Sequence, residues 1–201
     1  MASPSGRAKL EAMRRAEARR ARSQRAVLTG TGAVAVLLIA AVVVWAITRG
    51  RAASGAMTGL VTYQDLSRNH VEGPVTYAQT PPVGGEHSPV WLNCGIYDQP
   101  VPNENAVHSL EHGAVWVTYR PDLPADQVAV LREDVRNQPH GLLSPYPGLP
   151  TPVVATVWGV QLKLQSANDP RLGNFIAEYA DAGSAPEPHG ECTGGVGTPI
   201  G

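Results

Sequence analysis

The segment HSLEH, residues 108–112, has the residue types and the order of a known metal-binding motif. The order H-x-x-E-H is that of the inverted zinc peptidases, in which two histidines bind zinc and the glutamate acts as the base. The next residues, AVWVTY (114–119), alternate in a way that is typical of a β-strand. His108, Glu111 and His112 therefore form either a metal site or a polar group at the start of a strand.

The local conformation of this segment decides between the two. On a helix, residues at i and i+4 lie about 6 Å apart, so His108 and His112 could bind one metal ion. On a strand they lie about 13 Å apart, which is too far. Gly113 suits a helix end, and Asn103 or Asn105 suits a cap. A helix of this length is too short to be the active-site helix of an inverted zinc peptidase, so we do not expect an enzyme.

Further donors lie in the loop that precedes this segment. His87 follows Gly84 and Gly85, whose backbone freedom lets the loop fold over a neighbouring element. Together with the two histidines of HSLEH, a third ligand from His87, Glu86 or Glu111 would complete a site. Imidazole suits zinc, copper or iron, and we expect zinc or copper as the cofactor of such a site.

A hydrogen-bonded network without a metal is the alternative interpretation. Buried polar groups cost on the order of 1–3 kcal/mol each if they stay unpaired, so they pair with one another or with a metal. In both cases we expect four side chains to converge: His87, His108, Glu111 and His112. The remaining histidines are expected in solvent-exposed turns: His70, His140 and His189.

Strands and helices alternate after the HSLEH segment. Residues 114–119 predict a central strand, and residues 124–141 predict a helix with one apolar face. Residues 152–166 are β-branched and aromatic, which predicts one long strand with Gly159 as a bulge. Residues 169–183 begin with Asp169-Pro170, a typical start of a helix. The order predicts a small α+β domain with a short sheet and two helices.

A long loop, residues 73–105, shows neither a helical nor a strand period. It contains Trp91, Ile96 and Tyr97, which indicate that packing orders it. Because both faces of the strand AVWVTY are apolar and need to be covered, we expect the loop to fold back across the start of this strand. That would bring His87 toward HSLEH.

The charges of the chain are segregated. Eight of the ten charged residues before position 26 are basic, whereas six of the 16 Lys and Arg and 15 of the 17 Asp and Glu lie beyond Arg51. Residues 26–48 carry no charge, and 23 residues make about 35 Å of helix, enough to span a bilayer core of about 30 Å. A cleaved signal peptide has a shorter apolar core, so an uncleaved anchor is the favoured interpretation.

This pattern predicts a single-pass protein in the cell membrane. The basic side of an anchor stays in the cytoplasm, so the N-terminus is expected to be cytoplasmic and the C-terminal domain extracytoplasmic. The expected divisions are a basic tail (1–25), a transmembrane helix (26–48), a linker (49–62), the α+β domain (63–183) and a Gly/Pro-rich tail (184–201). The domain is acidic, which argues against nucleic acid as a partner.

The two cysteines, Cys94 and Cys192, both lie on the expected outer side. In an oxidising compartment such a pair favours a disulfide, which would tie down the C-terminal tail. The alternative is that Cys94 acts as a thiolate metal ligand.

Four stretches of the chain resemble an uncharacterised family of bacterial extracytoplasmic domains, often anchored by one N-terminal helix in actinobacteria. They are PPVGGEHSPVW, CGIYDQPVPNENAVHSLEHGAVWVTY, VVATVWG and FIAEY, within residues 65–185, and VHSLEHG is the most distinctive. The resemblance implies no activity. At the level of residues, the resemblance implies that six positions match the recurrent pattern of the family: His87, Tyr97, His108, Glu111, His112 and Gly113.

Two functions follow as expectations. The first is a non-enzymatic accessory or partner-binding module of the cell envelope, in which the polar cluster is structural and the partner is another envelope protein. The second is a zinc- or copper-binding protein that uses His87, His108 and His112.

Overall fold

The computed structural model describes residues 57–136, 138–180 and 183–200. The chain divides into two compact units, Met1–Ala53 and Ser54–Gly201, and the described residues all belong to the second. The basic tail and the expected transmembrane helix at 26–48 lie outside the described residues. Among the residues that are described, no helix has the length and apolar character needed to cross a membrane.

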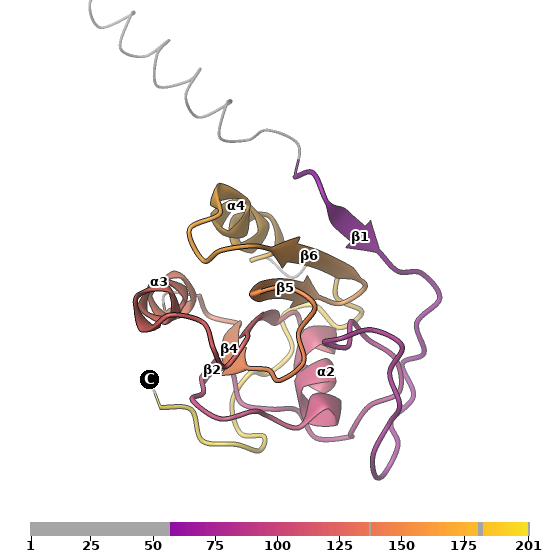
Figure 1. The fold of residues 1–201 in the computed structure, drawn as a ribbon. Helices are drawn as coiled ribbons and strands as arrows, with labels where there is room; N and C mark the ends of the chain where they lie inside the picture. The colour runs from indigo at the N-terminus through magenta and orange to yellow at the C-terminus, as the bar shows by residue number, and fades with distance from the viewer. Residues whose placement is uncertain (1–56, 137, 181–182, 201) are drawn as a thin grey trace, which may run out of the picture. The chain divides into compact units, whose positions relative to one another are not determined.

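A six-stranded mixed sheet forms the centre of the described unit (Figure 1). Its strands are β1 (Leu60–Thr62), β2 (Gly95–Ile96), β3 (Val115–Tyr119), β4 (Gly141–Pro145), β5 (Val153–Val157) and β6 (Val160–Leu164). They lie in the order β1-β6-β5-β3-β4-β2, and β4 is parallel to both β3 and β2 while the other pairs are antiparallel. The α+β class is thus confirmed.

β3 is the predicted central strand, and all five of its residues are buried. Its alternation places Val115, Val117 and Tyr119 on one face of the sheet, in the larger hydrophobic core. Trp116 points to the other face, where it is fully buried in a second core. Both faces of β3 are therefore covered, as its apolar composition requires.

The prediction of one long strand over 152–166 is wrong. The segment forms a hairpin in which β5 and β6 pair antiparallel through Val157 and Val160. Trp158 and Gly159 make the connection, and Gly159 has a φ of +71°, which glycine adopts at little cost. The two-residue connection with a glycine is itself a hairpin signal.

Helices α3 (Ala125–Arg136) and α4 (Pro170–Tyr179) cover one face of the sheet. Both were predicted, and the Asp169 side chain caps α4 by accepting a hydrogen bond from the Arg171 backbone N–H. Leu131 of α3 and Phe175 of α4 are fully buried against the sheet. This face therefore contains the larger hydrophobic core.

A third helix, α2 (Asn103–Glu111), covers the opposite face, so the prediction of two helices is corrected to three in the described residues. Its buried Val107 and Leu110 pack with Trp116 and Leu142 of the sheet. Figure 1 shows α2 on the side of the sheet opposite α3 and α4. The helix was missed as a firm element because its nine residues are too few for a clear period.

The strands at both edges were also missed. Leu60–Thr62 falls in the expected linker but forms β1, which pairs with β6. Gly95–Ile96 lies in the long loop and forms β2 beside β4. β4 itself contains a glycine and a proline, both poor strand formers, yet all five of its residues are buried.

The C-terminal tail, residues 183–200, lies along the loop that leads to α2 (Figure 1). The predicted disulfide between Cys94 and Cys192 is present, with the Cα atoms 5.2 Å apart. Backbone hydrogen bonds flank it: the Cys94 N–H donates to the Cys192 carbonyl at 2.8 Å, and the Asn93 N–H donates to the Val196 carbonyl at 2.8 Å. The alternative of Cys94 as a metal ligand is thereby excluded.

Candidate metal centre

Residues 108–111 form the last turn of α2 and His112 is its C-cap, which settles the conformation of the HSLEH segment as helical. Gly113 adopts a φ of +99°, its N–H donates to the Leu110 carbonyl, and the Ala114 N–H donates to the Ser109 carbonyl. These two bonds end the helix in a Schellman motif. His108 and His112 therefore lie one turn apart on the same side of a helix.

The start of α2 differs from expectation. Pro102 occupies the cap position and no side chain caps the helix, so the predicted Asn103 or Asn105 cap is wrong. Asn105 instead donates to the Val90 carbonyl at 2.6 Å and to the Ser88 hydroxyl at 3.1 Å. It thus holds the preceding loop against the helix.

The loop places His87 beside α2, and His87 in turn brings His70. The His87 N–H donates to the Asn69 carbonyl and the Val71 N–H donates to the His87 carbonyl, which makes a parallel β-bridge between His70 and His87. The His70 ring then stacks on the ring of His108, with the centroids 4.8 Å apart and the planes within 1°. Four histidine rings from three segments thus meet at the end of α2.

Three of these rings have one nitrogen fixed by a backbone carbonyl. The Nδ1 atoms of His87, His108 and His112 lie 2.7, 2.7 and 2.6 Å from the carbonyl oxygens of Gly85, Ser88 and Glu191. Because a carbonyl oxygen can only accept, each Nδ1 carries the hydrogen. A neutral ring in this tautomer has a free lone pair on Nε2, and this arrangement is typical of metal-binding histidines.

The Nε2 atoms of these rings lie close to other nitrogen or oxygen atoms that carry lone pairs. His108 Nε2 lies 3.0 Å from His112 Nε2, and His87 Nε2 lies 2.9 Å from Glu111 Oε2. His70 Nε2 lies 3.6 Å from the same carboxylate oxygen. Each close pair brings two lone-pair atoms together, so a proton or a metal ion has to lie between them.

A proton between His108 and His112 would make one of the rings a cation. Burial lowers the pKa of His108, the Ser88 hydrogen bond raises it by less, and the neighbouring rings of His112, His87 and His70 lower it further. The ring is only 4% exposed. The lowered pKa disfavours a proton on His108, and a metal ion between the two rings would need none.

The spacing of the donors fits one ion. His70, His87 and His108 each offer a nitrogen, and these three atoms lie within 4.8 Å of one another. Two ligands of a tetrahedral zinc at 2.0–2.1 Å lie about 3.4 Å apart, close to the 3.0 Å between His108 and His112. Glu111 adjoins His87 and His70, and His112 adjoins His108.

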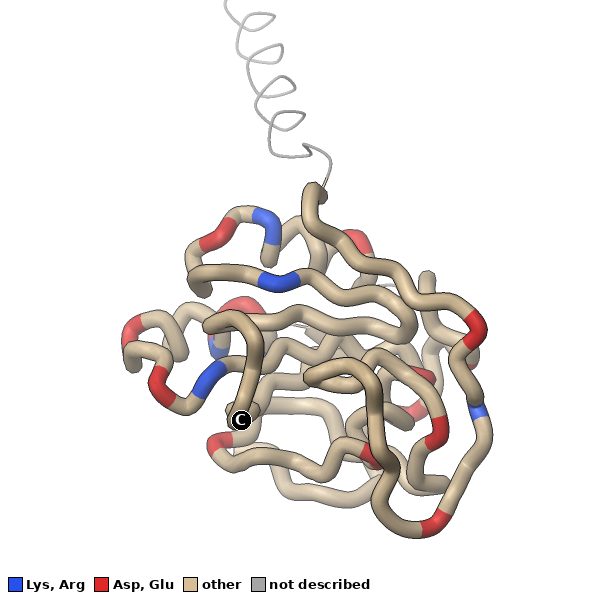
Figure 2. The backbone as a smooth tube through the Cα atoms, turned by 45° about the vertical axis from the view of Figure 1, so that its right-hand side comes forward, with Lys and Arg blue, Asp and Glu red and all other residues tan. Residues whose placement is uncertain are grey.

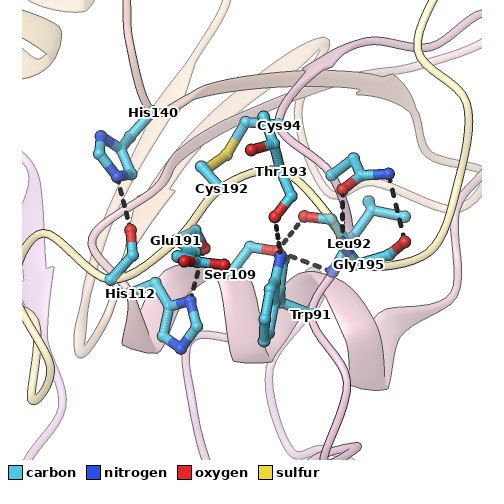
Figure 3. Close-up of a disulfide and its surroundings, with 12 residues drawn as sticks. Trp91, Leu92, Cys94, Ser109, His112, His140, Glu191, Cys192, Thr193 and Gly195 are labelled. Carbon is cyan, nitrogen blue, oxygen red and sulfur yellow. Dashed lines mark hydrogen bonds between the residues drawn. A yellow bond between two sulfur atoms is a disulfide. The ribbon is translucent and has the colours of Figure 1, made fainter.

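Aromatic rings and the C-terminal tail enclose the cluster. The Trp158 ring packs against His87 and the Trp91 ring against His112, with centroids 5.7 and 5.1 Å apart. The tail covers His112: Figure 3 shows its ring bonded to Glu191, next to the disulfide. A Cβ on Gly190 would lie 2.5 Å from the His112 ring, so only glycine fits there without displacement.

The structure brings together the four residues of the expected cluster, all of them buried: His87, His108, Glu111 and His112. It adds His70, which was expected to be an isolated turn residue and whose side chain is 46% exposed. His70 was missed because a single histidine in an irregular segment has no pattern around it. His140 is half-buried rather than exposed, and lies 2.9 Å from the Gly190 carbonyl, whereas His189 is exposed as expected.

The supporting residues have other positions. Glu86 is exposed and is held through its backbone carbonyl, which accepts from the Tyr77 hydroxyl at 2.8 Å. The Tyr97 hydroxyl donates to the Asn93 carbonyl at 2.7 Å, and its ring belongs to the second core. Gly113 ends α2. These residues hold the loops around the cluster and do not belong to the donor set.

Comparison with known proteins agrees with the resemblance to an uncharacterised family. The model of a family described as protein of unknown function (DUF3105) matches residues 70–194, well over half of the chain. This range includes the whole histidine cluster and both cysteines. No curated protein and no solved structure matches the chain. The chain belongs to DUF3105, a family of proteins of unknown function.

Proposed function

We propose that this protein binds one divalent zinc or copper ion in the cluster formed by His70, His87 and His108, with His112 as a fourth ligand and Glu111 beside them. One observation carries the proposal: the Nε2 atoms of His108 and His112 lie 3.0 Å apart while both Nδ1 atoms face backbone carbonyls. Neutral rings held in this way offer two lone pairs to the same point, which is the arrangement that a metal ion needs.

The donor set selects the kind of ion. Both cysteines are joined in the disulfide, so neither offers a thiolate. The cluster consists of imidazole and carboxylate groups, which suit Zn²⁺ and Cu²⁺, whereas Cu⁺ prefers soft sulfur ligands. Between the two divalent ions, the same nitrogen site generally binds Cu²⁺ more tightly.

A purely structural hydrogen-bond network is the competing account. It explains His87 and Glu111, because an imidazolium can donate to a carboxylate at 2.9 Å. It accounts less well for the pair of His108 and His112, because the extra proton that this pair needs is disfavoured on His108, whose pKa is lowered. A metal ion bound by the Nε2 atoms of His108 and His112 removes the need for this proton.

We also propose that residues 26–48 anchor the protein in the cell membrane and that the metal-binding domain lies on the extracytoplasmic side. The uncharged length of this segment and the basic residues before it support the proposal. The disulfide supports it as well, because disulfides persist in oxidising compartments. The domain would then act at the outer membrane face, as an accessory of the envelope whose ligand is a metal ion.

Metal content tests the function. Full-length protein purified in mild detergent would be incubated with Zn²⁺ or Cu²⁺, freed of excess metal by gel filtration and assayed by elemental analysis. We expect one equivalent in the wild type and in His189→Asn, whose exposed histidine lies outside the donor set, and none in His108→Ala. Wild-type protein that retains no metal, or His108→Ala that retains a full equivalent, would exclude the proposed site.

A further inference from the structure

His70 differs from the other three histidines of the cluster in how it is held. His87, His108 and His112 are at most 6% exposed, and each has its Nδ1 bonded to a backbone carbonyl. The His70 side chain is 46% exposed. Among the described residues, no backbone carbonyl holds its ring, which is positioned by stacking on His108, by edge contact with His87 and by the Glu111 carboxylate 3.6 Å from its Nε2.

The segment that carries His70 is also weakly attached. The parallel bridge to His87 consists of two backbone hydrogen bonds, at 2.8 and 3.1 Å, and has no further ladder on either side. His87 itself is held more firmly, because Ser88 next to it bonds to α2 through Glu104 and Asn105. His70 can therefore leave the cluster while the buried histidines stay in place.

We propose that His70 is a displaceable metal ligand and that the bound ion is exchangeable cargo, which enters and leaves on the His70 side. This inference rests on the proposed metal-binding function. A structural site has all its ligands fixed and closed, whereas a site that keeps one position accessible can accept an outside ligand. Here the accessible position is the one that His70 fills.

The exchange is a ligand substitution without a redox step. An incoming donor, such as an imidazole, carboxylate or thiolate of an acceptor, forms a bond to the metal with its own lone pair. The bond between the metal and His70 Nε2 breaks, and His70 leaves as a neutral imidazole with its lone pair. His87 and His108 keep the ion in place during this step, and the ion then passes to the acceptor.

The charge of the domain favours the arrival of cations. Acidic positions outnumber basic ones along the described backbone (Figure 2). Glu187 places a carboxylate oxygen 3.8 Å from His112 Nε2, and its side chain is 63% exposed. A negative field of this kind raises the local concentration of cations and speeds their association.

The test follows metal loss from full-length protein in detergent. Wild type, His70→Ala and the exposed-site control His189→Asn would each be loaded with one equivalent of Cu²⁺ and mixed with excess EDTA, and the Cu²⁺ absorbance recorded against time. His70→Ala is expected to bind one equivalent but to lose it about tenfold faster. This factor is at the lower end of the about 10–100-fold loss of metal affinity that is typical when a residue supporting a metal site is changed. The rate should rise in proportion to the EDTA concentration. Free imidazole should slow the loss from His70→Ala by refilling the vacant position, and His189→Asn should match the wild type.

Each outcome decides the inference. Loss from His70→Ala at the wild-type rate would show that His70 does not bind the ion, and would overturn the inference alone. Failure of His70→Ala to bind Cu²⁺ at all, as expected of His108→Ala, would make His70 a fixed ligand and would also overturn it. A wild type that binds no Cu²⁺ would overturn the proposed function together with this inference. The exposure of His70 makes it unlike the buried histidines, so His70→Ala is expected to fold, and circular dichroism would check this.

Discussion

Replacing Cys192 with serine is expected to weaken the fold and the metal site together. The disulfide closes a loop with a sequence separation of 98 residues. In the chain-entropy model such a closure contributes about 4–5 kcal/mol to the free energy of unfolding. A domain of this size has a total stability of about 5–15 kcal/mol, so Cys192→Ser should remove a large share of it.

The effect on the metal site comes through the neighbouring residue. The carbonyl of Glu191 accepts the His112 Nδ1–H at 2.6 Å (Figure 3). The Cys192 carbonyl accepts the Cys94 N–H at 2.8 Å. Without the disulfide the tail loses this fixed position, and the His112 ring loses the bond that orients it. Loss of such an orienting partner lowers metal affinity about 10–100-fold.

Two measurements on the full-length protein check these expectations. Urea unfolding of the metal-free protein should show a lower midpoint for Cys192→Ser, an equal loss for Cys94→Ser, and no further loss for the double variant. Cu²⁺ titration under conditions where circular dichroism shows folded protein should show the weaker affinity. An unchanged midpoint would refute the structural role of the disulfide, and wild-type affinity in a variant with a lowered midpoint would refute the role of the tail in orienting His112.

Three further predictions concern pH, packing and topology. The pKa of His108 is lowered in the folded protein, so the unfolded chain binds this proton more readily. The metal-free protein should therefore be most stable above about pH 6.5 and lose stability as the pH falls. In urea unfolding, the stability of His108→Gln should depend less on pH than that of the wild type. Gly190→Ala should lower metal affinity in Cu²⁺ titration because its Cβ would meet the His112 ring at 2.5 Å, while Gly173→Ala, with open space around it, should bind normally. Protease treatment of intact cells should cleave the chain after Arg51, and complete protection of that part would contradict the extracytoplasmic placement.

Elements with their own local signals could be predicted from the sequence. α4 begins at Asp169-Pro170 as expected, because a capping side chain and a proline at the first turn are local features. β3 was predicted from the alternation of its residues. The convergence of His87 with α2 was expected from a simple requirement, since the long loop has to cover the apolar face of β3.

Elements that depend on distant partners could not be predicted. β4 contains Gly141 and Pro145 and becomes a strand because β3 and β2 pair with it on both sides. The conformation of HSLEH could not be decided from the sequence, because tertiary contacts could bury these residues equally well on a helix and on a strand. His70 reaches the cluster through a single backbone bridge to His87, and a bridge between irregular segments leaves no pattern in the sequence.

Crystals of zinc-loaded protein, with anomalous diffraction recorded at the zinc absorption edge, would test the central claim most directly. The account predicts one anomalous peak at about 2.0–2.1 Å from His108 Nε2, with nitrogen atoms of His70, His87 and His112 within bonding distance of the same peak. Loaded crystals with no peak at the end of α2, and with His108 and His112 hydrogen-bonded to each other instead, would contradict the metal centre.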